Sequence, residues 1–327
     1  MKRFYLLFAF LLIATFSQAQ VIVNKELFLM GTDFTITVVA STSEIGQLHI
    51  SDAVSEIRRI EALISSWKET SETTRINNNA GVQPVKVSEE LFNLIKRSIA
   101  ISKLTDGAFD ISYASMDRIW RFDGSMKQMP SDEAIKISVA NVGYNGIELN
   151  EIDHTVFLKR EGMKIGFGAI GKGYAADAAK ALLVQNGVAA GIINASGDMN
   201  TWGTQPNGSP WRVAITNPLD NNKAFAMLPI TDAVVTSGNY EKFVMFNDIR
   251  YAHIIDPRTG YPSQGILSVT VFAPKAELAD ALATSVFVMG IETGIDRMNQ
   301  FPGVECIAIS TDGAIFTTKN IKLDLKK

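Results

Sequence analysis

A glycine-rich run at residues 166–173, Gly-Phe-Gly-Ala-Ile-Gly-Lys-Gly, precedes an expected helix that ends before Asn186-Gly187. Glycines in such a run let backbone N–H groups approach a pyrophosphate at the N-terminus of a helix. The run also matches the fingerprint of nicotinamide-dinucleotide folds, but that fingerprint requires an acidic residue about 20 positions later, at the end of the next strand. The next expected strand ends at Asn194. We therefore interpret the run as a phosphate cradle for another nucleotide, with a purely structural turn as the alternative.

Hydrophobic periodicity predicts helices and strands interleaved along the chain. Helices are expected at 43–67, 88–104, 174–185 and 276–289, and strands at 26–39 around a turn at 30–32, at 146–149, 155–158, 190–194, 211–216, 224–228, 233–237 and 267–272, with a hairpin at 306–318. Residues 70–81 are expected to form a loop, and the chain after Tyr113 to be irregular up to 146. With 46% hydrophobic residues, no repeat and no linker, the chain is expected to be an α+β enzyme.

The first twenty residues have the pattern of a secretory signal peptide. A basic start at Lys2 and Arg3 is followed by an apolar stretch at 4–16 and by small residues up to Ala19. The apolar stretch is shorter than the roughly 20 residues of a membrane-spanning helix. We therefore expect a signal peptide at 1–19, a domain at 20–327, and an exported, periplasmic, soluble protein, with an uncleaved anchor as the alternative. The single cysteine, Cys306, cannot form a disulfide within the chain.

The charge distribution excludes one class of partner. The formal net charge is −3, and acidic and basic residues are interspersed without a basic stripe. Proteins that bind nucleic acid carry a clustered positive surface. No nucleic-acid partner is therefore expected.

Two polar clusters in the second half of the chain could contribute to a site. Residues 236–240 read Thr-Ser-Gly-Asn-Tyr, and residues 253–262 read His-Ile-Ile-Asp-Pro-Arg-Thr-Gly-Tyr-Pro. His253 and Asp256 lie at the end of an expected strand, before a turn that a proline fixes, so both are expected beside one cleft. Proton transfer or phosphate contact is expected of His253. Residues 194–198, Asn-Ala-Ser-Gly-Asp, also end a strand, but alone such a segment is more often only a tight turn.

Asp280 and Thr284 are four residues apart on the helix expected at 276–289. At that spacing both side chains lie on one helical face and can present two hard oxygens to the same cation. Magnesium takes few protein oxygens and completes its shell with water and ligand phosphates. An ordinary helical aspartate and threonine are the alternative in isolation.

Taken in order, short segments make the chain resemble the FAD:protein FMN transferase family, also called the ApbE family. These segments are Met30-Gly31-Thr32, Ser66-Trp67-Lys68 with Arg75-Ile-Asn77, 107–110, 168–177, 194–198, 236–240, 253–260 and 279–284. They extend over nearly the whole mature chain. The resemblance implies an ApbE-like α+β fold of mixed sheets with interleaved helices and an active-site cleft between two intimately associated subdomains.

The resemblance also implies a reaction. FAD is cleaved at its pyrophosphate, AMP leaves, and FMN forms a phosphoester with a threonine or serine of an acceptor protein. The expected acceptor is a subunit of the electron-transfer type, and only through it would the chain be associated with a membrane. An in-line displacement at phosphorus needs charge neutralisation more than covalent help from the enzyme.

The resemblance implies specific residue roles. Asp280, Thr284 and the backbone carbonyl of Ala169 are expected to bind Mg²⁺, and His253 and Asp256 are the candidates for the general base. Contacts with FAD are expected at Met30, Trp67, Ala108, Phe109, Asp110, Lys172, Ser237 and Ile254.

Two positions depart from the family pattern. Gly166 stands where many members have an acidic residue, which removes one expected contact with FAD. Trp67 stands where a tyrosine usually stacks on the flavin, and its larger ring still offers a face for stacking. Two alternative functions are a magnesium-dependent FAD pyrophosphatase, which would pass FMN to water, and a non-catalytic exported flavin-binding protein.

Overall fold

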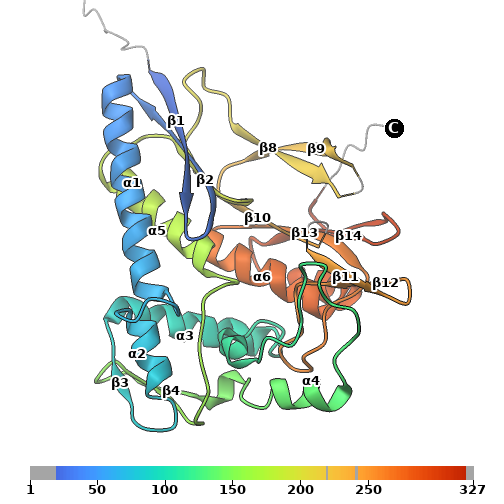
Figure 1. The fold of residues 1–327 in the computed structure, drawn as a ribbon. Coiled ribbons are helices and arrows are strands. Elements are labelled where there is room, and N and C mark those ends of the chain that lie inside the picture. Colours follow the sequence, from blue (N-terminus) through green and yellow to red (C-terminus); the bar gives the residue numbers. More distant parts are fainter. Residues whose placement is uncertain (1–19, 219, 240–241, 322–327) are drawn as a thin grey trace, which may run out of the picture.

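The computed structural model describes residues 20–218, 220–239 and 242–321 (Figure 1). The expected signal peptide at 1–19 lies outside the described residues. The helices are α1 (Ser43–Ile64), α2 (Glu72–Asn78), α3 (Glu89–Leu104), α4 (Asp132–Ser138), α5 (Gly171–Gln185), α6 (Ala276–Met289) and α7 (Ile291–Met298), with two short 3₁₀ helices, η1 (Ile111–Ser115) and η2 (Tyr144–Gly146). The strands are β1 (Val21–Leu29), β2 (Thr32–Ala40), β3 (Val85–Lys86), β4 (Ile147–Asn150), β5 (Thr155–Leu158), β6 (Gly191–Ala195), β7 (Asp198–Trp202), β8 (Trp211–Asn217), β9 (Asp220–Ile230), β10 (Ala233–Gly238), β11 (Phe243–Phe246), β12 (Ile249–Ala252), β13 (Ile266–Ala273), β14 (Glu305–Ser310) and β15 (Ile315–Thr317). In the described part of the chain, every helix is too short or too polar to cross a bilayer.

The largest sheet has eight strands in the order β1-β2-β6-β7-β10-β13-β14-β15. Each of its neighbouring pairs is antiparallel. A nicotinamide-binding fold requires a parallel sheet whose strand leads directly into the glycine turn. Here β5 ends at Leu158, well before the glycine run, so the structure rules out that interpretation of the run.

Side chains on the two faces of this sheet enter different cores because successive residues of a strand point to opposite sides. Val38 and Val235 lie in the main core, which α1, α5 and α6 cover. Their neighbours Val39 and Val234 lie in a smaller core beneath the β8–β9 hairpin. Figure 1 shows the helices on one side of the sheet and this hairpin on the other.

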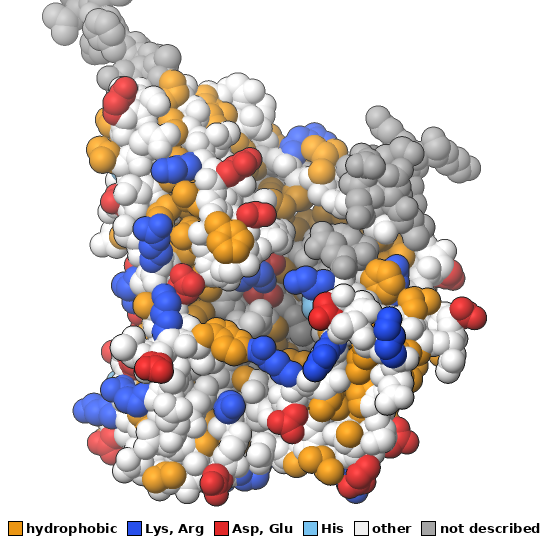
Figure 2. All heavy atoms as spheres, in the orientation of Figure 1, with side chains coloured by type: hydrophobic (Ala, Val, Ile, Leu, Met, Phe, Trp, Pro, Cys, Tyr) orange, Lys and Arg blue, Asp and Glu red, His pale blue; other side chains and the backbone are white. Residues whose placement is uncertain are grey.

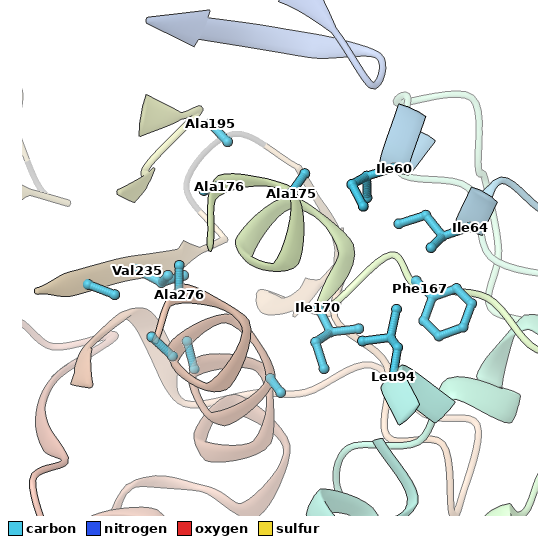
Figure 3. Packing of buried hydrophobic residues seen from close by; sticks show 14 of the residues in the cluster. Ile60, Ile64, Leu94, Phe167, Ile170, Ala175, Ala176, Ala195, Val235 and Ala276 are labelled. Carbon is cyan, nitrogen blue, oxygen red and sulfur yellow. The ribbon is translucent and has the colours of Figure 1, made fainter. Parts of the chain in front are cut away.

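The first turn of α5 lies at the centre of the main core. Figure 3 shows side chains from five other elements around it, contributed by α1 (Ile60, Ile64), α3 (Leu94), β6 (Ala195), β10 (Val235) and α6 (Ala276). One core therefore joins the sheet to the helices α1 to α3. The smaller core beneath the β8–β9 hairpin and a cluster around Trp120, Ile135 and Ile255 are separate from it. The first turn of α5 is thus packed against several elements of the main core, while Gly168 in the glycine run is exposed.

Two predicted irregular segments are helical, so these predictions were wrong. Within 70–81 the helix α2 forms because the Ser71 hydroxyl accepts a hydrogen bond from the Thr74 N–H at 2.9 Å, and because Ile76 is buried. After Tyr113, Ser131 caps α4 in the same way, and Ile135 anchors that helix in the small cluster. In both cases a serine N-cap followed by a single buried isoleucine is enough for two turns.

The other expected elements are confirmed with small shifts of their ends. The start of a strand shifts most, since β1 begins at Val21 rather than at 26. Helix α5 begins at Gly171 rather than at Tyr174, so Lys172 and Gly173 belong to its first turn. The segment at 194–198 ends a strand and forms a tight turn, as expected: β6 ends at Ala195, and β7 begins at Asp198. The hairpin β11–β12 and the helix α7 were not predicted.

Candidate active site

The N-terminus of α5 has no side-chain cap. Its N-cap residue, Ile170, makes no side-chain hydrogen bond to the first turn. Gly171 is packed against α1, since a Cβ added there would lie 2.8 Å from Cδ1 of Ile64. The Gly171 N–H donates to the Phe167 carbonyl oxygen at 2.7 Å, and the positive end of the helix dipole favours an anion at this position. Binding of a phosphate group here stays a prediction.

Helix α6 crosses this helix end at very short range. A Cβ added to Gly173 would lie 2.2 Å from the carbonyl oxygen of Ala276, so only glycine fits there. One turn further along α6, Asp280 Oδ2 accepts a long hydrogen bond of 3.4 Å from the Gly173 N–H. The structure therefore brings Asp280 to the glycine run, 107 residues away in the sequence.

The Lys172 ammonium group lies between two buried carboxylates. Its Nζ is 2.5 Å from Oδ2 of Asp198 and 3.7 Å from Oδ2 of Asp280, and both aspartates are 3% exposed. Burial raises the pKa of the Asp198 carboxyl well above its usual range, the Asp280 carboxylate acts in the same direction, and the ammonium group opposes both. Burial would lower the pKa of Lys172, but the two carboxylates outweigh it and the pKa is raised. Lys172 therefore remains a cation at the end of α5.

Asp198 lies at the candidate site, but the sequence alone did not indicate a function for it. The segment around it was interpreted mainly as a tight turn, because nothing local indicates a partner. Asp198 begins β7 and pairs with Val235 of β10, and this places its carboxylate against the first turn of α5. Ser237, an expected FAD contact, is half-buried two residues further along β10.

The residues expected to hold a magnesium ion lie on α6 and just before α5. The Asp280 carboxylate makes the two long contacts given above and also interacts with the Asp198 carboxylate. Thr284 is half-buried one turn further along the same face, and Ala169 directly precedes the N-cap of α5. No group of three or more Asp, Glu, His or Cys side chains capable of holding a metal occurs in the part of the chain that the structure describes. A donor set with few protein oxygens is the kind that Mg²⁺ takes when phosphates complete its shell.

Met30 lies next to the same helix end, and Trp67 lies near the start of the glycine run. Met30 has a φ of 50° in the β1–β2 turn, and its Cε is 3.9 Å from a Cβ added to Gly171. Trp67 follows Ser66, whose Oγ is 3.8 Å from a Cβ added to Gly166. The Trp67 ring is 76% exposed, with the Arg118 guanidinium carbon 4.5 Å from its centroid. An exposed indole beside a phosphate-binding backbone can stack on a flat ligand.

Local packing explains why residue 166 is a glycine. Its N–H donates to the Ile111 carbonyl oxygen at 2.9 Å. A Cβ added to Gly166 would lie 3.0 Å from Cβ of Ala114, so an acidic side chain would require η1 to move. The lack of an acidic side chain at position 166 thus goes together with the close packing of η1 against Gly166.

Three expected FAD contacts have side chains that face inward. Ala108 and Phe109 are 1% and 2% exposed. Asp110 accepts hydrogen bonds of 2.7 Å from the N–H groups of Ser112 and Tyr144, and burial raises its pKa despite these bonds. The side chains of this segment thus order η1 and η2 and are not presented to the surface.

His253 and Asp256 lie in one turn, but their surroundings differ. Asp256 is bound by its own turn, since Arg258 donates to its carboxylate from Nε at 2.9 Å and from Nη2 at 2.8 Å. His253 is exposed, with its ring edge-on to Phe122 and its Nδ1 3.2 Å from the Lys242 carbonyl oxygen. A carbonyl oxygen only accepts, so Nδ1 carries the proton in this contact and Nε2 is the basic nitrogen. Ile254, the next residue, is half-buried against the main core.

The surface over α5 and α6 is hollowed. Figure 2 shows the hollow at the centre of this face, with acidic and basic side chains inside it and basic side chains along its lower rim. The described face therefore offers a charged recess above the uncapped end of α5, flanked by exposed apolar side chains.

Comparisons with known proteins agree on one family. The family model described as the ApbE family matches residues 30–308. A protein of Escherichia coli K12 named FAD:protein FMN transferase is 32% identical over 265 residues, which is 79% of this chain and 75% of that protein. A protein of the same name from Treponema pallidum is 30% identical over 281 residues, covering 81% of this chain and 78% of its own. The crystal structure of the ApbE protein from Thermotoga maritima superimposes with a TM-score of 0.81 at 31% identity, covering 93% of this chain and 99% of that one. The flavin transferase ApbE from Vibrio cholerae gives a TM-score of 0.79 at 26% identity, with 92% and 98% covered.

Proposed function

The chain belongs to the ApbE family, and we propose that it is an FAD:protein FMN transferase that cleaves FAD at its pyrophosphate and attaches FMN to an acceptor protein. The observation that carries this proposal is the convergence of Lys172, Asp198 and Asp280 on the uncapped N-terminus of α5. A diphosphate is the ligand that such a combination of backbone N–H groups, ammonium and acidic metal ligand suits.

The reaction is a displacement at the phosphorus of the FMN half. The hydroxyl oxygen of the acceptor threonine or serine forms a bond to that phosphorus, the P–O bond to AMP breaks, and AMP leaves with the electron pair. The proton of the hydroxyl goes to a general base. Lys172 and the positive N-terminal end of α5 attract the diphosphate oxygens and stabilise the charge that grows on them.

Magnesium is proposed to be held by the Asp280 carboxylate, the Thr284 hydroxyl and the Ala169 carbonyl. When bound, the ion supplies a Lewis acid that neutralises diphosphate oxygens. Asp198 supports this arrangement because it takes the shorter contact with Lys172 and leaves Asp280 the longer one.

His253 is the better of the two candidates for the general base. The Asp256 carboxylate is occupied by Arg258 and by the backbone of its own turn. His253 is exposed, and with the proton on Nδ1 the other ring nitrogen, Nε2, is the basic atom. We therefore assign proton acceptance to His253 and an ordering role to Asp256.

Trp67 is proposed to stack on the flavin ring. Replacing Trp67 with Ala is expected to raise the KM for FAD about tenfold, because a stacked ring contact is worth about 1 kcal/mol or more. Thermal stability should stay unchanged, since the side chain is 76% exposed. Steady-state kinetics at saturating acceptor measures the effect, and Trp67→Tyr, which keeps an aromatic face, serves as the matched control. A KM for FAD in Trp67→Ala equal to that of the parent chain would remove Trp67 from the site.

The acceptor is proposed to be an exported subunit of the electron-transfer type, with the enzyme acting in the periplasm after removal of residues 1–19. The signal-peptide pattern at the start of the chain supports this location. A mature N-terminus at Gln20 in a periplasmic extract is the expected result of N-terminal sequencing. A chain that retains residues 1–19 in the cytoplasmic fraction would contradict it.

The proposed function is tested by measuring both products, AMP and FMN. The purified chain is incubated with FAD and Mg²⁺, with and without a flavin-carrier domain whose acceptor threonine is present or replaced by valine. With the threonine form of the domain, the expected result is AMP and covalently bound FMN in equal amounts. Without the domain, or with the valine form, little of either product is expected. Free FMN at a rate independent of the domain would instead show a pyrophosphatase, and intact FAD throughout would show a carrier.

A further inference from the structure

The first turn of α6 is capped by a side chain from another helix. Its own N-cap residue, Lys275, has an extended backbone and makes no side-chain hydrogen bond. Instead, the N–H groups of Ala276 and Glu277 donate to the Asp177 carboxylate on α5, at 2.9 and 3.0 Å. A carboxylate at this helix end satisfies two N–H groups and faces the positive end of the helix dipole.

Asp177 is itself held in place from the sheet. The Asn200 amide of β7 donates to its Oδ1, and Lys180 Nζ donates to the Asn200 carbonyl oxygen at 2.8 Å. Asn200 is only 2% exposed. The carboxylate therefore has one fixed orientation relative to α5 and β7, and α6 is aligned to it.

This cap lies one turn before Asp280. Ala276, whose N–H is capped, is also the residue whose carbonyl oxygen touches Gly173, so the two helices have no space to slide. Asp280 is four residues further and faces the same end of α5. A shift or fraying of the first turn of α6 would move the Asp280 carboxylate away from the glycine run.

We propose that Asp177 is a positioning residue that holds the first turn of α6 against α5 and thereby sets the affinity of the Asp280 site for a divalent ion. This inference rests on the proposed function, since it concerns the same site. In a competing explanation, Asp177 contributes only to stability. Arg97 also holds this turn in place, since its Nε and Nη2 donate to the Glu277 carboxylate at 2.6 and 2.9 Å.

The test supplies the missing cap from α6 itself. Asp177→Ala removes the cap, and Lys275→Asp places a carboxylate at the N-cap position, where it can accept from the second and third N–H groups of the helix. Lys275 is exposed, and its ammonium group acts to lower the pKa of the Asp177 carboxyl, so Lys275→Asp alone is included to measure the effect of this charge change. The four chains, including the double variant, are titrated with Mn²⁺ alone while free Mn²⁺ is followed by electron paramagnetic resonance. Melting temperatures and Mg²⁺-dependent FMN transfer are measured alongside.

Asp177→Ala is expected to weaken Mn²⁺ binding about tenfold, as loss of a supporting contact to a metal ligand commonly does. The Mg²⁺ concentration for half-maximal transfer should rise by the same factor, with a smaller change in kcat. Lys275→Asp should restore most of the Mn²⁺ affinity in the double variant. Asp177→Asn, which keeps one acceptor oxygen, should lie in between, and it replaces Asp177→Ala if that variant does not fold.

Two results would overturn the proposal. One is Mn²⁺ affinity in Asp177→Ala and Asp177→Asn equal to that of the parent chain. The other is a double variant whose melting temperature recovers while its Mn²⁺ affinity does not, since capping of α6 would then not be what sets the site. Failure of the proposed function is distinct, because it would appear in the parent chain as absence of transfer.

Discussion

Asp280→Ala is expected to lower the rate of FMN transfer by about a thousandfold or more. The variant removes the only carboxylate of α6 that faces the end of α5, and with it the proposed anchor of the magnesium ion. Losing a group that stabilises developing charge costs about 10²–10³ in rate, and a metal ion contributes several kcal/mol more. The fold should persist, because the variant loses only long contacts of 3.4 and 3.7 Å and relieves the repulsion between the Asp280 and Asp198 carboxylates. AMP release at saturating FAD and acceptor measures the effect.

Two further variants make this result specific. Asp280→Asn keeps the shape and removes the charge, so it should be nearly as inactive as Asp280→Ala. Asp296→Ala removes an exposed carboxylate from the neighbouring helix α7 and should retain the parent rate. Transfer at the parent rate in Asp280→Ala, with unchanged dependence on Mg²⁺, would refute the assignment of the metal site.

Gly173→Ala is expected to impair both folding and activity. Alanine normally favours a helix over glycine by about 1 kcal/mol, so propensity alone predicts stabilisation. The new Cβ would however lie 2.2 Å from the backbone oxygen of Ala276, and α5 and α6 would have to separate. Overpacking of this kind costs about 1–3 kcal/mol, and displacement of Asp280 by about 1 Å can cost 10²-fold in rate. Denaturant unfolding and FMN transfer measure the two effects.

Gly168→Ala is the control for the stability measurement. It lies in the same run with an ordinary φ, and a Cβ added there meets nothing within 4 Å. Its free energy of unfolding should therefore stay close to that of the parent chain. If Gly173→Ala were equally well tolerated and fully active, the tight α5–α6 contact would not be what places Asp280.

Local pattern was enough to predict much of the fold. The apolar stripes of α1 and α3 predict both helices, because their side chains at three- and four-residue spacing face one core. The bounds of α6 are those expected, and helical spacing places Asp280 and Thr284 on one face. The glycine run indicates that another backbone segment or a ligand comes close to it. Gly173 is in such contact with the backbone of Ala276, and the ligand is expected at the end of α5.

Contacts between distant segments could not be predicted in this way. Asp198 is 26 residues from Lys172, and Asp177 is 99 residues from the N–H that it caps in α6. Neither aspartate differs locally from an ordinary turn or helix residue. The inward orientation of the Phe109 side chain could not be predicted either, because its burial depends on how α3 and η1 pack rather than on the residues of its own segment. Short helices such as α2 depend on one cap and one buried side chain, which composition does not reveal.

The central claim is that Asp280 and the N-terminus of α5 share a divalent ion with the diphosphate of FAD. A crystal structure with FAD and Mn²⁺, whose anomalous scattering locates the metal, tests this directly. The expected result is a metal peak about 2.1 Å from an Asp280 carboxylate oxygen, with diphosphate oxygens in its shell and Lys172 beside them. A diphosphate bound away from Gly171–Gly173, or a metal peak with no contact to Asp280, would contradict the account.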